Sequence, residues 1–373
     1  MKRRDFLKVS GCVAMGASVH GLLVSQMLAA EQPDGFVREA SWYRKLDGRQ
    51  VECLLCPRHC QVADQETGFC GVRTNQNGTY YTHVYGRPVT IANDPIEKKP
   101  LFHFKPGSEA FSFATAGCNL ECQFCQNWEI SQFRPEQVPS RFGFVSPEAM
   151  VGMARQRGAK SIAFTYSEPV VFFEYAKDVA RLARSAGIPA VMISNGYIEP
   201  KPMEELLAVL GAVKIDFKGY SESFYRTWCR GELKPVLATM RAVKEKKVWL
   251  ELVHLTIPTL NDGETQTREL CAWILDNLGP DVPIHFTRFH PTYKLKNLPA
   301  TPPATLQKQW EIARKVGLRY PYVGNLPGHD GENTRCHRCG KMLIRRVGFT
   351  PVTNQIKDGK CMFCQQSIPG VWS

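Results

Sequence analysis

The sequence lacks any interior hydrophobic run long enough to cross a membrane, and it has no long low-complexity tract. A transmembrane helix needs about 18 or more mainly apolar residues, so we expect no membrane span in the mature chain. The 373 residues are 43% apolar and 22% charged, as in a globular protein. This length suits one core of TIM-barrel size with small modules attached to it.

The first thirty residues differ from the rest and predict a targeting signal. Residues 1–8 read M-K-R-R-D-F-L-K, a twin-arginine start, and a mildly apolar run follows over residues 9–28. Ala29 and Ala30 offer a cleavage site, so residues 1–30 are interpreted as a Tat export signal and the mature protein as periplasmic. The alternative is an uncleaved basic helix and a cytoplasmic protein. Too few apolar residues precede Cys12 for the lipoprotein box that its context resembles.

Acidic residues are scarce near the C-terminus. The chain has a formal net charge of +12, and residues 334–373 hold seven Lys or Arg residues against a single acid, Asp358. A basic face could meet an acidic partner or a nucleic acid, but a solvated charged surface is the favoured interpretation. We therefore expect no stable nucleic-acid binding.

The middle one of three cysteine groups lacks a fourth member. Its spacing is C-x3-C-x2-C, whereas structural zinc sites and simple electron-transfer clusters normally take four protein ligands. Three ligands leave one metal coordination position open for chemistry. Of the fourteen cysteines, eleven fall in these groups: Cys53, Cys56, Cys60 and Cys70; Cys118, Cys122 and Cys125; Cys336, Cys339, Cys361 and Cys364.

The two outer groups carry C-x2-C pairs, a spacing that puts two thiolates on one metal ion. For the C-terminal group we predict a zinc-ribbon or rubredoxin-like metal site. For the N-terminal group we predict a bound metal, which the spacing leaves open as zinc or an accessory iron–sulfur cluster. Disulfides are the alternative for both groups in an exported protein. Cys229 and Cys271 stand alone and are expected to be thiols without a role.

From about residue 110 to residue 325, short runs of β-branched and aromatic residues alternate with helical periodicity. Ser146 and Pro147 mark one helix start, and Gly158 and Gly187 follow helix ends. Helices are predicted over residues 147–157, 169–186, 202–210, 237–246, 264–278 and 304–316. The predicted strands cover residues 110–115, 161–166, 190–194, 213–217, 248–256, 284–289 and 318–323.

Strands alternating with crossover helices predict an α/β fold with a parallel sheet. About six such units indicate a partial (β/α)6 TIM-like barrel, and a doubly wound open sheet is the competing topology. Polar clusters follow nearly every strand, and the C-terminal rim is where a βα-barrel gathers its functional groups; this favours the barrel. The expected domains are the signal at 1–30, an N-terminal cysteine module at 31–105, the barrel at 106–325 and a C-terminal module at 326–373.

The motif G-C-N-L-E-C-Q-F-C-Q-N at residues 117–127 directly follows the first predicted barrel strand. Together with N-D-P-I-E-K-K-P-L at residues 93–101 and the flanking cysteine modules, it resembles the radical S-adenosylmethionine (SAM) enzymes. More narrowly, the chain resembles the pyruvate formate-lyase activating enzyme-related group, including the AmmeMemoRadiSam-system proteins. The resemblance covers essentially all of the chain after the export signal.

The resemblance implies that Cys118, Cys122 and Cys125 hold a [4Fe-4S] cluster whose fourth iron is chelated by SAM. Reductive cleavage of SAM would give methionine and a 5′-deoxyadenosyl radical, which abstracts a hydrogen atom from a substrate. The protein would thus be a radical SAM oxidoreductase that receives its electron from a flavodoxin- or ferredoxin-like donor. The substrate is left open as a backbone glycine of a partner enzyme, another protein or a small molecule.

The resemblance also implies cofactor contacts on the barrel rim. Phe124 matches an aromatic position near the adenine, although ordinary packing is an equal alternative. Glu168 keeps the carboxylate of the Gly-Gly-Glu motif that contacts the SAM ammonium, but both glycines are replaced. Ser194 and Asn195 match the position that reaches the SAM carboxylate or ribose. Asp216 and Lys218 match the Asp-x-Lys pattern of activating enzymes, with a buried ion pair as the alternative.

Three histidines near the predicted strands are further candidates for the site, and a second class of function remains as an alternative. His285 lies within a predicted strand and suits a hydrogen-bonded core position, whereas His290, at a strand exit, is the better substrate-side candidate; His254 has no assigned role. The alternative function is a non-catalytic iron–sulfur or zinc protein that carries electrons or binds a partner. The incomplete middle cysteine group argues against it, because a carrier gains nothing from an iron that lacks a ligand.

Overall fold

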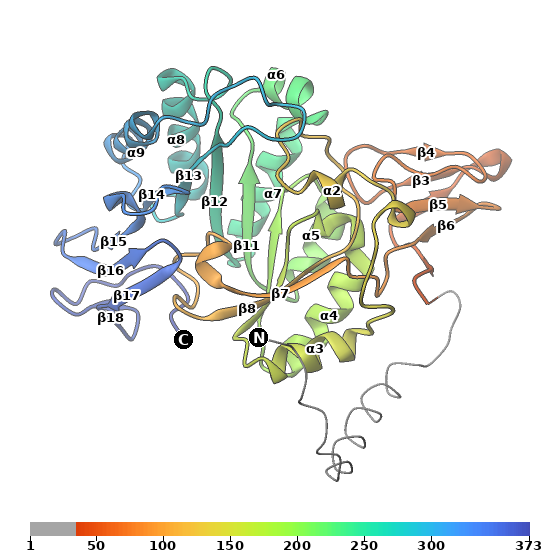
Figure 1. Cartoon of the computed structure of the whole chain (residues 1–373), viewed down its shortest axis with the longest axis horizontal. Helices are drawn as coiled ribbons and strands as arrows, with labels where there is room; N and C mark the ends of the chain where they lie inside the picture. The colour runs from red at the N-terminus through yellow and green to blue at the C-terminus, as the bar shows by residue number, and fades with distance from the viewer. Residues whose placement is uncertain (1–34) are drawn as a thin grey trace, which may run out of the picture. The chain divides into compact units, whose positions relative to one another are not determined.

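The computed structural model describes residues 35–373, and Phe36–Ser373 forms one compact unit (Figure 1). The predicted Tat signal at residues 1–30, with Cys12, lies outside the described residues. Among the helices of residues 35–373, none has the length and apolarity that a membrane crossing needs.

One eight-stranded sheet organises the unit. Its strands lie in the spatial order β14-β13-β12-β11-β10-β9-β8-β7. Strands β8 to β14 are parallel, and β7 is antiparallel to β8. The strands are β7 (Thr90–Pro95), β8 (Glu109–Ala114), β9 (Ser161–Phe164), β10 (Ala190–Ser194), β11 (Leu210–Phe217), β12 (Trp249–Thr256), β13 (Ile284–Arg288) and β14 (Pro321–Gly324).

All seven strands predicted for the barrel are confirmed, and so are the helices that follow them. The side chain of Ser146 accepts a hydrogen bond from the Ala149 amide, and Pro147 occupies the first turn, as expected of a capped helix start. The crossover helices are α3 (Pro147–Gln156), α4 (Phe173–Ser185), α5 (Pro200–Leu207), α7 (Leu233–Glu245), α8 (Glu264–Leu278) and α9 (Pro303–Val316).

The remaining helical elements are short. They are α2 (Trp128–Ser131), α6 (Glu222–Phe224), the π-helix η5 (Tyr225–Cys229) and the 3-10 turns η1 (Asp47–Arg49), η2 (Ile96–Lys98), η3 (Pro135–Gln137), η4 (Pro169–Phe172) and η6 (Asp330–Glu332).

The strand order decides between the two topologies left open by the sequence. In a doubly wound sheet the order reverses at a switch point, whereas here each strand from β8 onward is added next to the preceding one. Right-handed crossovers then place the helices on one face, as in a βα-barrel. Strands β7 and β14 form separate edges, so the barrel is partial and not closed. Strands such as β10 are buried along their whole length, which suits parallel strands covered on both faces.

The N-terminal cysteine module consists of two small antiparallel sheets, β1-β6-β5 and β2-β3-β4. A buried ion pair joins it to the barrel: the guanidinium of Arg73 donates to both carboxylate oxygens of Glu174 on α4, at 3.0 and 2.6 Å. The strands are β1 (Arg38–Glu39), β2 (Tyr43–Lys45), β3 (Val51–Cys53), β4 (Gln61–Val62), β5 (Arg73–Gln76) and β6 (Thr79–Thr82).

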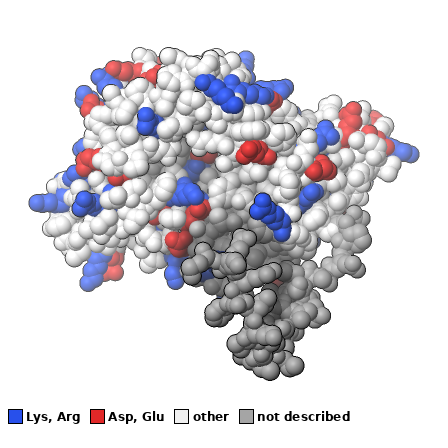
Figure 2. All heavy atoms as spheres, in the orientation of Figure 1, with Lys and Arg blue, Asp and Glu red and all other residues white. Residues whose placement is uncertain are grey.

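The C-terminal module docks beside β12–β14 through buried polar groups. Arg346 donates to the Phe102 carbonyl at 2.9 Å. Thr334 Oγ1 lies 2.9 Å from Tyr322 Oη of β14. The segment that Arg346 contacts is in turn held to β12 by Glu251, which accepts from the backbone amides of Phe102 and His103. The module's strands are β15 (Thr334–Arg335), β16 (Met342–Val347), β17 (Thr350–Asn354), β18 (Ile356–Lys357) and β19 (Lys360–Cys361). On the face shown in Figure 2, most basic side chains are dispersed among uncharged and acidic ones.

Candidate SAM and iron–sulfur site

The loop with the three central cysteines leaves β8 through Gly117, whose φ is +97°. A Cβ atom at this position would lie 2.4 Å from Val72 Cγ1 and 2.9 Å from the Cys70 carbonyl oxygen. Glycine is therefore needed both for the backbone conformation and for the contact with the N-terminal module. The loop's direction away from the sheet depends on this residue.

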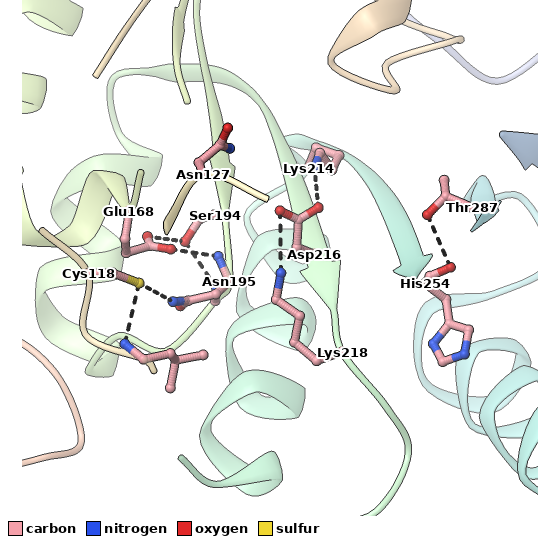
Figure 3. A network of polar contacts seen from close by, with 12 residues as sticks. Cys118, Asn127, Glu168, Ser194, Asn195, Lys214, Asp216, Lys218, His254 and Thr287 are labelled. Carbon is pink, nitrogen blue, oxygen red and sulfur yellow. Dashed lines mark hydrogen bonds and ion pairs between the residues drawn. The ribbon is translucent and has the colours of Figure 1, made fainter. Parts of the chain in front are cut away.

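Hydrogen bonds fix the loop around Cys118. Its sulfur accepts from the Leu120 amide at 3.4 Å and from Asn195 Nδ2 at 3.8 Å. The same Asn195 amide donates to Asn119 Oδ1 at 2.9 Å, and Asn119 Nδ2 donates to the Tyr197 carbonyl at 2.6 Å. The Cys118 sulfur is thereby tied to the loop after β10 (Figure 3).

The π-helix η5 supports the other side of the same loop. Its Trp228 and Cys229 carbonyls accept from the amides of Gln123 and Glu121, both at 2.9 Å. The fully buried Cys229 thiol also lies against Cys122 and raises the pKa of that thiol, together with burial. Cys229 was expected to have no role, but the structure places it beside a predicted cluster ligand. Its chain position, far from the motif, gave no signal of this contact.

A cavity of about 510 Å³ opens above the C-terminal ends of the strands. The three central cysteines line it, and so do five of the six rim residues predicted from the sequence. The sixth, Ser194, is not part of the lining, but its hydroxyl donates to the lining residue Glu168. The lining includes Cys118, Cys122, Phe124, Cys125, Glu168, Asn195, Asp216 and Lys218. Residues far apart in the sequence thus converge on one site.

Glu168 is a buried carboxylate held only by neutral donors among the described residues. Its oxygens accept from Ser194 Oγ at 2.6 Å, from the Asn195 amide at 2.8 Å and from the Val170 amide at 3.1 Å (Figure 3). Burial raises its pKa to about 7 despite these hydrogen bonds. A cationic or amino group entering the cavity would complement this carboxylate.

Asp216 lies between two lysines at the end of β11 (Figure 3). It pairs with Lys214 and, at 3.7 Å, with Lys218. Burial opposes ionisation, but the two ammonium groups outweigh it and lower the pKa of Asp216. The ion pair of Asp216 and Lys218, the alternative to a cofactor contact, is therefore present, and both residues also line the cavity. Lys214 is a third member that the sequence reasoning did not single out.

A second polar cluster on the cavity wall was not predicted. Lys99 is buried and contacts Asp94 at 2.5 Å and Tyr166 Oη at 3.2 Å, and Tyr166 also donates to Asp94. Lys98 contacts the other Asp94 oxygen at 2.8 Å. Burial lowers the pKa of Lys99 to about 8. Asp94, Lys98 and Lys99 belong to the motif at 93–101, which carried the resemblance without an assigned chemical role.

Tyr166 takes the place of a glycine that the resemblance leads one to expect. Its φ is +67°, in the left-handed region that favours glycine. Its carbonyl accepts from Asn127 Nδ2 at 2.8 Å, and its ring lies 4.4 Å from the Lys99 ammonium. The loop thus keeps a glycine-like backbone conformation, and the added ring contributes to the lysine cluster.

The three histidines lie outside the lining of the cavity. His285 is buried in the core and paired with Glu251, which agrees with the predicted core position. His290 is exposed and outside the cavity lining, so the structure does not support a substrate-side role for it. His254 is buried behind Thr287, and burial lowers its pKa to about 4. Two further lining residues, Asn325 and Phe349, come from the loop after β14 and from the C-terminal module.

The C-terminal cysteines form a compact group. The sulfurs of Cys336, Cys339, Cys361 and Cys364 all lie within 4.8 Å of one another, with pairs at 3.6 and 3.8 Å. Four sulfurs on one tetrahedral zinc ion stand about 3.8 Å apart, given Zn–S bonds of about 2.3 Å. This group can hold a metal ion, as predicted.

Comparisons with known proteins agree with this geometry. Residues 113–271 match the family model described as the Radical SAM superfamily. The chain is 42% identical over 334 residues to the uncharacterized protein MJ0808 of Methanocaldococcus jannaschii, which covers 89% of this chain and 99% of that protein. The chain belongs to the radical SAM superfamily. This membership implies SAM and an iron–sulfur cluster as cofactors.

Two further similarities concern radical SAM proteins with described activities. The pyruvate formate-lyase-activating enzyme of Clostridium pasteurianum is 23% identical over 182 residues, or 47% of this chain and 72% of that enzyme. The crystal structure of a radical SAM methyltransferase from Sphaerobacter thermophilus superposes with a TM-score of 0.50 at 13% identity, covering 87% of this chain and 86% of that one. The latter shows the fold alone.

The residues present fit these cofactors. Three thiols without a fourth line one cavity, and the buried Glu168 carboxylate beside them has no cationic partner within residues 35–373. That donor set suits a cluster with one open iron and an amino-bearing ligand. The individual contacts of Phe124, Ser194, Asn195, Asp216 and Lys218 with SAM stay predictions.

Proposed function

We propose that this protein is a radical SAM enzyme that cleaves SAM reductively and abstracts a hydrogen atom from a substrate. The observation that supports it most is the convergence of the three central cysteines and Glu168 on one cavity at the strand ends. When bound, the cluster supplies the electron that cleaves a C–S bond of SAM and so generates the group that takes the hydrogen atom.

The chain's own residues bind and orient. The three cysteine thiolates hold the cluster, and Glu168 accepts from the amino group of SAM. Asn195 fixes the Cys118 sulfur while its backbone amide holds the Glu168 carboxylate in place. The buried aromatic side chain of Phe124 lies on the cavity wall, where it packs against Phe224 and excludes water from the adenine end.

The substrate-side wall favours an anionic substrate. Four lysines line the cavity, namely Lys98, Lys99, Lys214 and Lys218, against the lining carboxylates of Glu168 and Asp216 and against Asp94, which pairs with Lys98 and Lys99. Cations at a cavity wall attract carboxylate or phosphate groups. We therefore expect the hydrogen donor to be a molecule or peptide segment that carries such a group. Similarity to the activating enzyme of Clostridium pasteurianum supports a second candidate, a glycine of a partner enzyme.

The decisive experiment is anaerobic reconstitution with iron, sulfide, SAM and dithionite, followed by measurement of 5′-deoxyadenosine. Wild type should form it, and Cys122→Ala should not. Cys271→Ala is the matched control, because Cys271 is a buried cysteine of α8 outside the cavity lining. Formation of 5′-deoxyadenosine by Cys122→Ala at the wild-type rate would refute the assignment.

Export and electron supply complete the proposal. Residues 1–30 would direct the folded protein to the periplasm, and a flavodoxin- or ferredoxin-like protein would supply the electron. Cell fractionation of wild type and of a variant with Arg3→Lys and Arg4→Lys tests the first point. Equal distribution of both proteins between the compartments would contradict export by the twin-arginine signal.

A further inference from the structure

The four N-terminal cysteines line a small cavity of their own. Cys53, Cys56, Cys60 and Cys70 line it together with apolar side chains and Arg73. Its free volume is about 20 Å³, roughly what one water molecule needs. Four thiols that converge on one site inside a packed module are a donor set for a metal centre.

The spacing of the sulfurs distinguishes this group from the C-terminal one. In the described part of the chain, only the C-terminal four sulfurs form a set of three or more within 4.8 Å of one another. The N-terminal four therefore stand too far apart for one ion that binds them all. A cubane cluster places each thiolate on a different iron, so its thiolates lie around a larger core.

Arg73 gives a second, independent indication. Its side chain is 1% exposed and lines the cavity. The two terminal nitrogens bind Glu174 and the Val171 carbonyl, but the Nε atom has no hydrogen-bond partner among residues 35–373. Buried donors are rarely left unpaired, and hydrogen bonds to the sulfurs are a usual feature of iron–sulfur sites.

The cavity adjoins the loop that carries the first cluster. The Cys70 carbonyl oxygen lies against Gly117, next to Cys118. Asn119 lines the N-terminal cavity and binds Asn195, which donates to the Cys118 sulfur. In addition, Arg58 beside the cysteines donates to the Asn119 carbonyl at 2.6 Å. Asn119 thus contacts residues beside both the N-terminal and the central cysteine group.

We infer that Cys53, Cys56, Cys60 and Cys70 bind a second [4Fe-4S] cluster that relays single electrons to the first. Every iron has a thiolate ligand, so this cluster has no open position for SAM and exchanges electrons only. A low-potential one-electron donor protein reduces it by one electron, and it is reoxidised as that electron passes to the first cluster. The relay role rests on the proposed function, whereas the binding of the cluster does not.

The main test leaves the N-terminal cysteines untouched. In a variant with Cys118, Cys122 and Cys125 all replaced by Ala, about four iron and about four sulfide per chain should remain after anaerobic reconstitution. Their Mössbauer spectrum should be that of a [4Fe-4S] cluster, and their EPR signal after reduction should not respond to SAM. Zinc without sulfide at these cysteines, or a Cys53–Cys70 group oxidised to disulfides, would overturn the inference.

A measurement on wild type covers the case in which that variant does not fold. Wild type should hold about eight cluster irons, and SAM should change the spectrum of only one of its two clusters. Cys56→Ala should lose the SAM-insensitive cluster, and Cys271→Ala should lose neither. A wild-type protein with one cluster, all of it SAM-responsive, refutes the second cluster alone. One that keeps only a SAM-insensitive cluster refutes the proposed function alone.

Discussion

Glu168 shows how one buried residue couples the cofactor to pH. Its pKa is raised from the ordinary 4.5 to about 7 by burial. A raised folded-state pKa means that this group stabilises the empty protein below its unfolded pKa, and that the contribution is lost as pH rises through about 7. The binding of an amino-bearing ligand has the opposite pH dependence, because such a ligand favours the ionised carboxylate.

We therefore predict that SAM binding strengthens from about pH 6 to about pH 8, and that Glu168→Gln removes this part of the dependence. Loss of a hydrogen bond to a charged group weakens binding by about tenfold to a hundredfold. Equilibrium binding of SAM to the reconstituted protein measures both effects. Glu148→Gln, at an exposed position of α3, is the control. Identical pH profiles for wild type and Glu168→Gln would remove Glu168 from the site.

Alanine variants of Gly117 and Gly187 can separate the cost of a steric clash from the cost of a left-handed backbone. Gly117→Ala meets Val72 and the Cys70 carbonyl at short range, while Gly187→Ala has a similarly positive φ, +74°, but open space around its Cβ position. Left-handed backbone costs a non-glycine residue about 1–2 kcal/mol at either position, and the clash adds about 1–3 kcal/mol at Gly117 alone.

The expected result is that Gly117→Ala unfolds at a lower denaturant concentration than Gly187→Ala and binds less iron. Chemical unfolding and iron analysis of the two variants side by side provide the measurement. Equal losses in both would mean that only the backbone conformation matters.

At the scale of elements, the strands and crossover helices could be predicted because each follows a local rule. The hydrophobic periodicity, the Ser146–Pro147 cap and the glycines that end helices all depend on residues close together in the sequence. The choice of a barrel came from the polar clusters at strand ends, and the sequential strand order agrees with it.

Contacts across elements could not be predicted in this way. Lys99 meets Tyr166, and Cys229 meets Cys122, only because the sheet brings distant loops to one rim. Likewise, no local pattern tells that Phe349 of the C-terminal module reaches the cavity. Sequence motifs located the cysteines and Glu168. The lysine cluster could not be located in this way, because it forms only when residues far apart in the sequence meet in the folded protein.

Helix α4 anchors the N-terminal module through a buried pair, so this pair should matter for stability. Arg73 and Glu174 are 1% and 6% exposed. Glu174→Gln keeps the shape but leaves the Arg73 charge unpaired, which we expect to cost about 3–5 kcal/mol. Glu204→Gln breaks the exposed pair with Lys246 and should cost less than about 1 kcal/mol. Denaturant unfolding of both variants tests this; equal costs would show that the buried pair is not the anchor.

At the scale of the whole molecule, the C-terminal module is tied to the barrel by groups that are costly to expose. Arg346 and Glu97 are both fully buried, with Arg346 Nε 3.8 Å from the Glu97 carboxylate. Burial raises the pKa of Glu97 to about 6. A metal that orders Cys336 and its three partners therefore also holds this buried interface in place.

We predict that a variant with Cys336→Ser and Cys364→Ser loses one metal ion per chain and melts at a lower temperature than wild type. Because Phe349 lines the cavity, its SAM affinity should fall as well. Metal analysis, calorimetry and SAM binding give the three readouts, with Cys271→Ala as the control. Unchanged metal content in the double variant would contradict a site at these four cysteines.

The close contact between Gly117 and Cys70 has a consequence for the assembly of the metal clusters. With the N-terminal module packed on the loop, Cys53, Cys56 and Cys122 are buried, so iron and sulfide should enter more readily while this contact is open. Assembly of the clusters and closure of this contact are then coupled. Because the twin-arginine route carries substrates that have already folded, a chain sent along it would have to receive its iron before it left the compartment of synthesis.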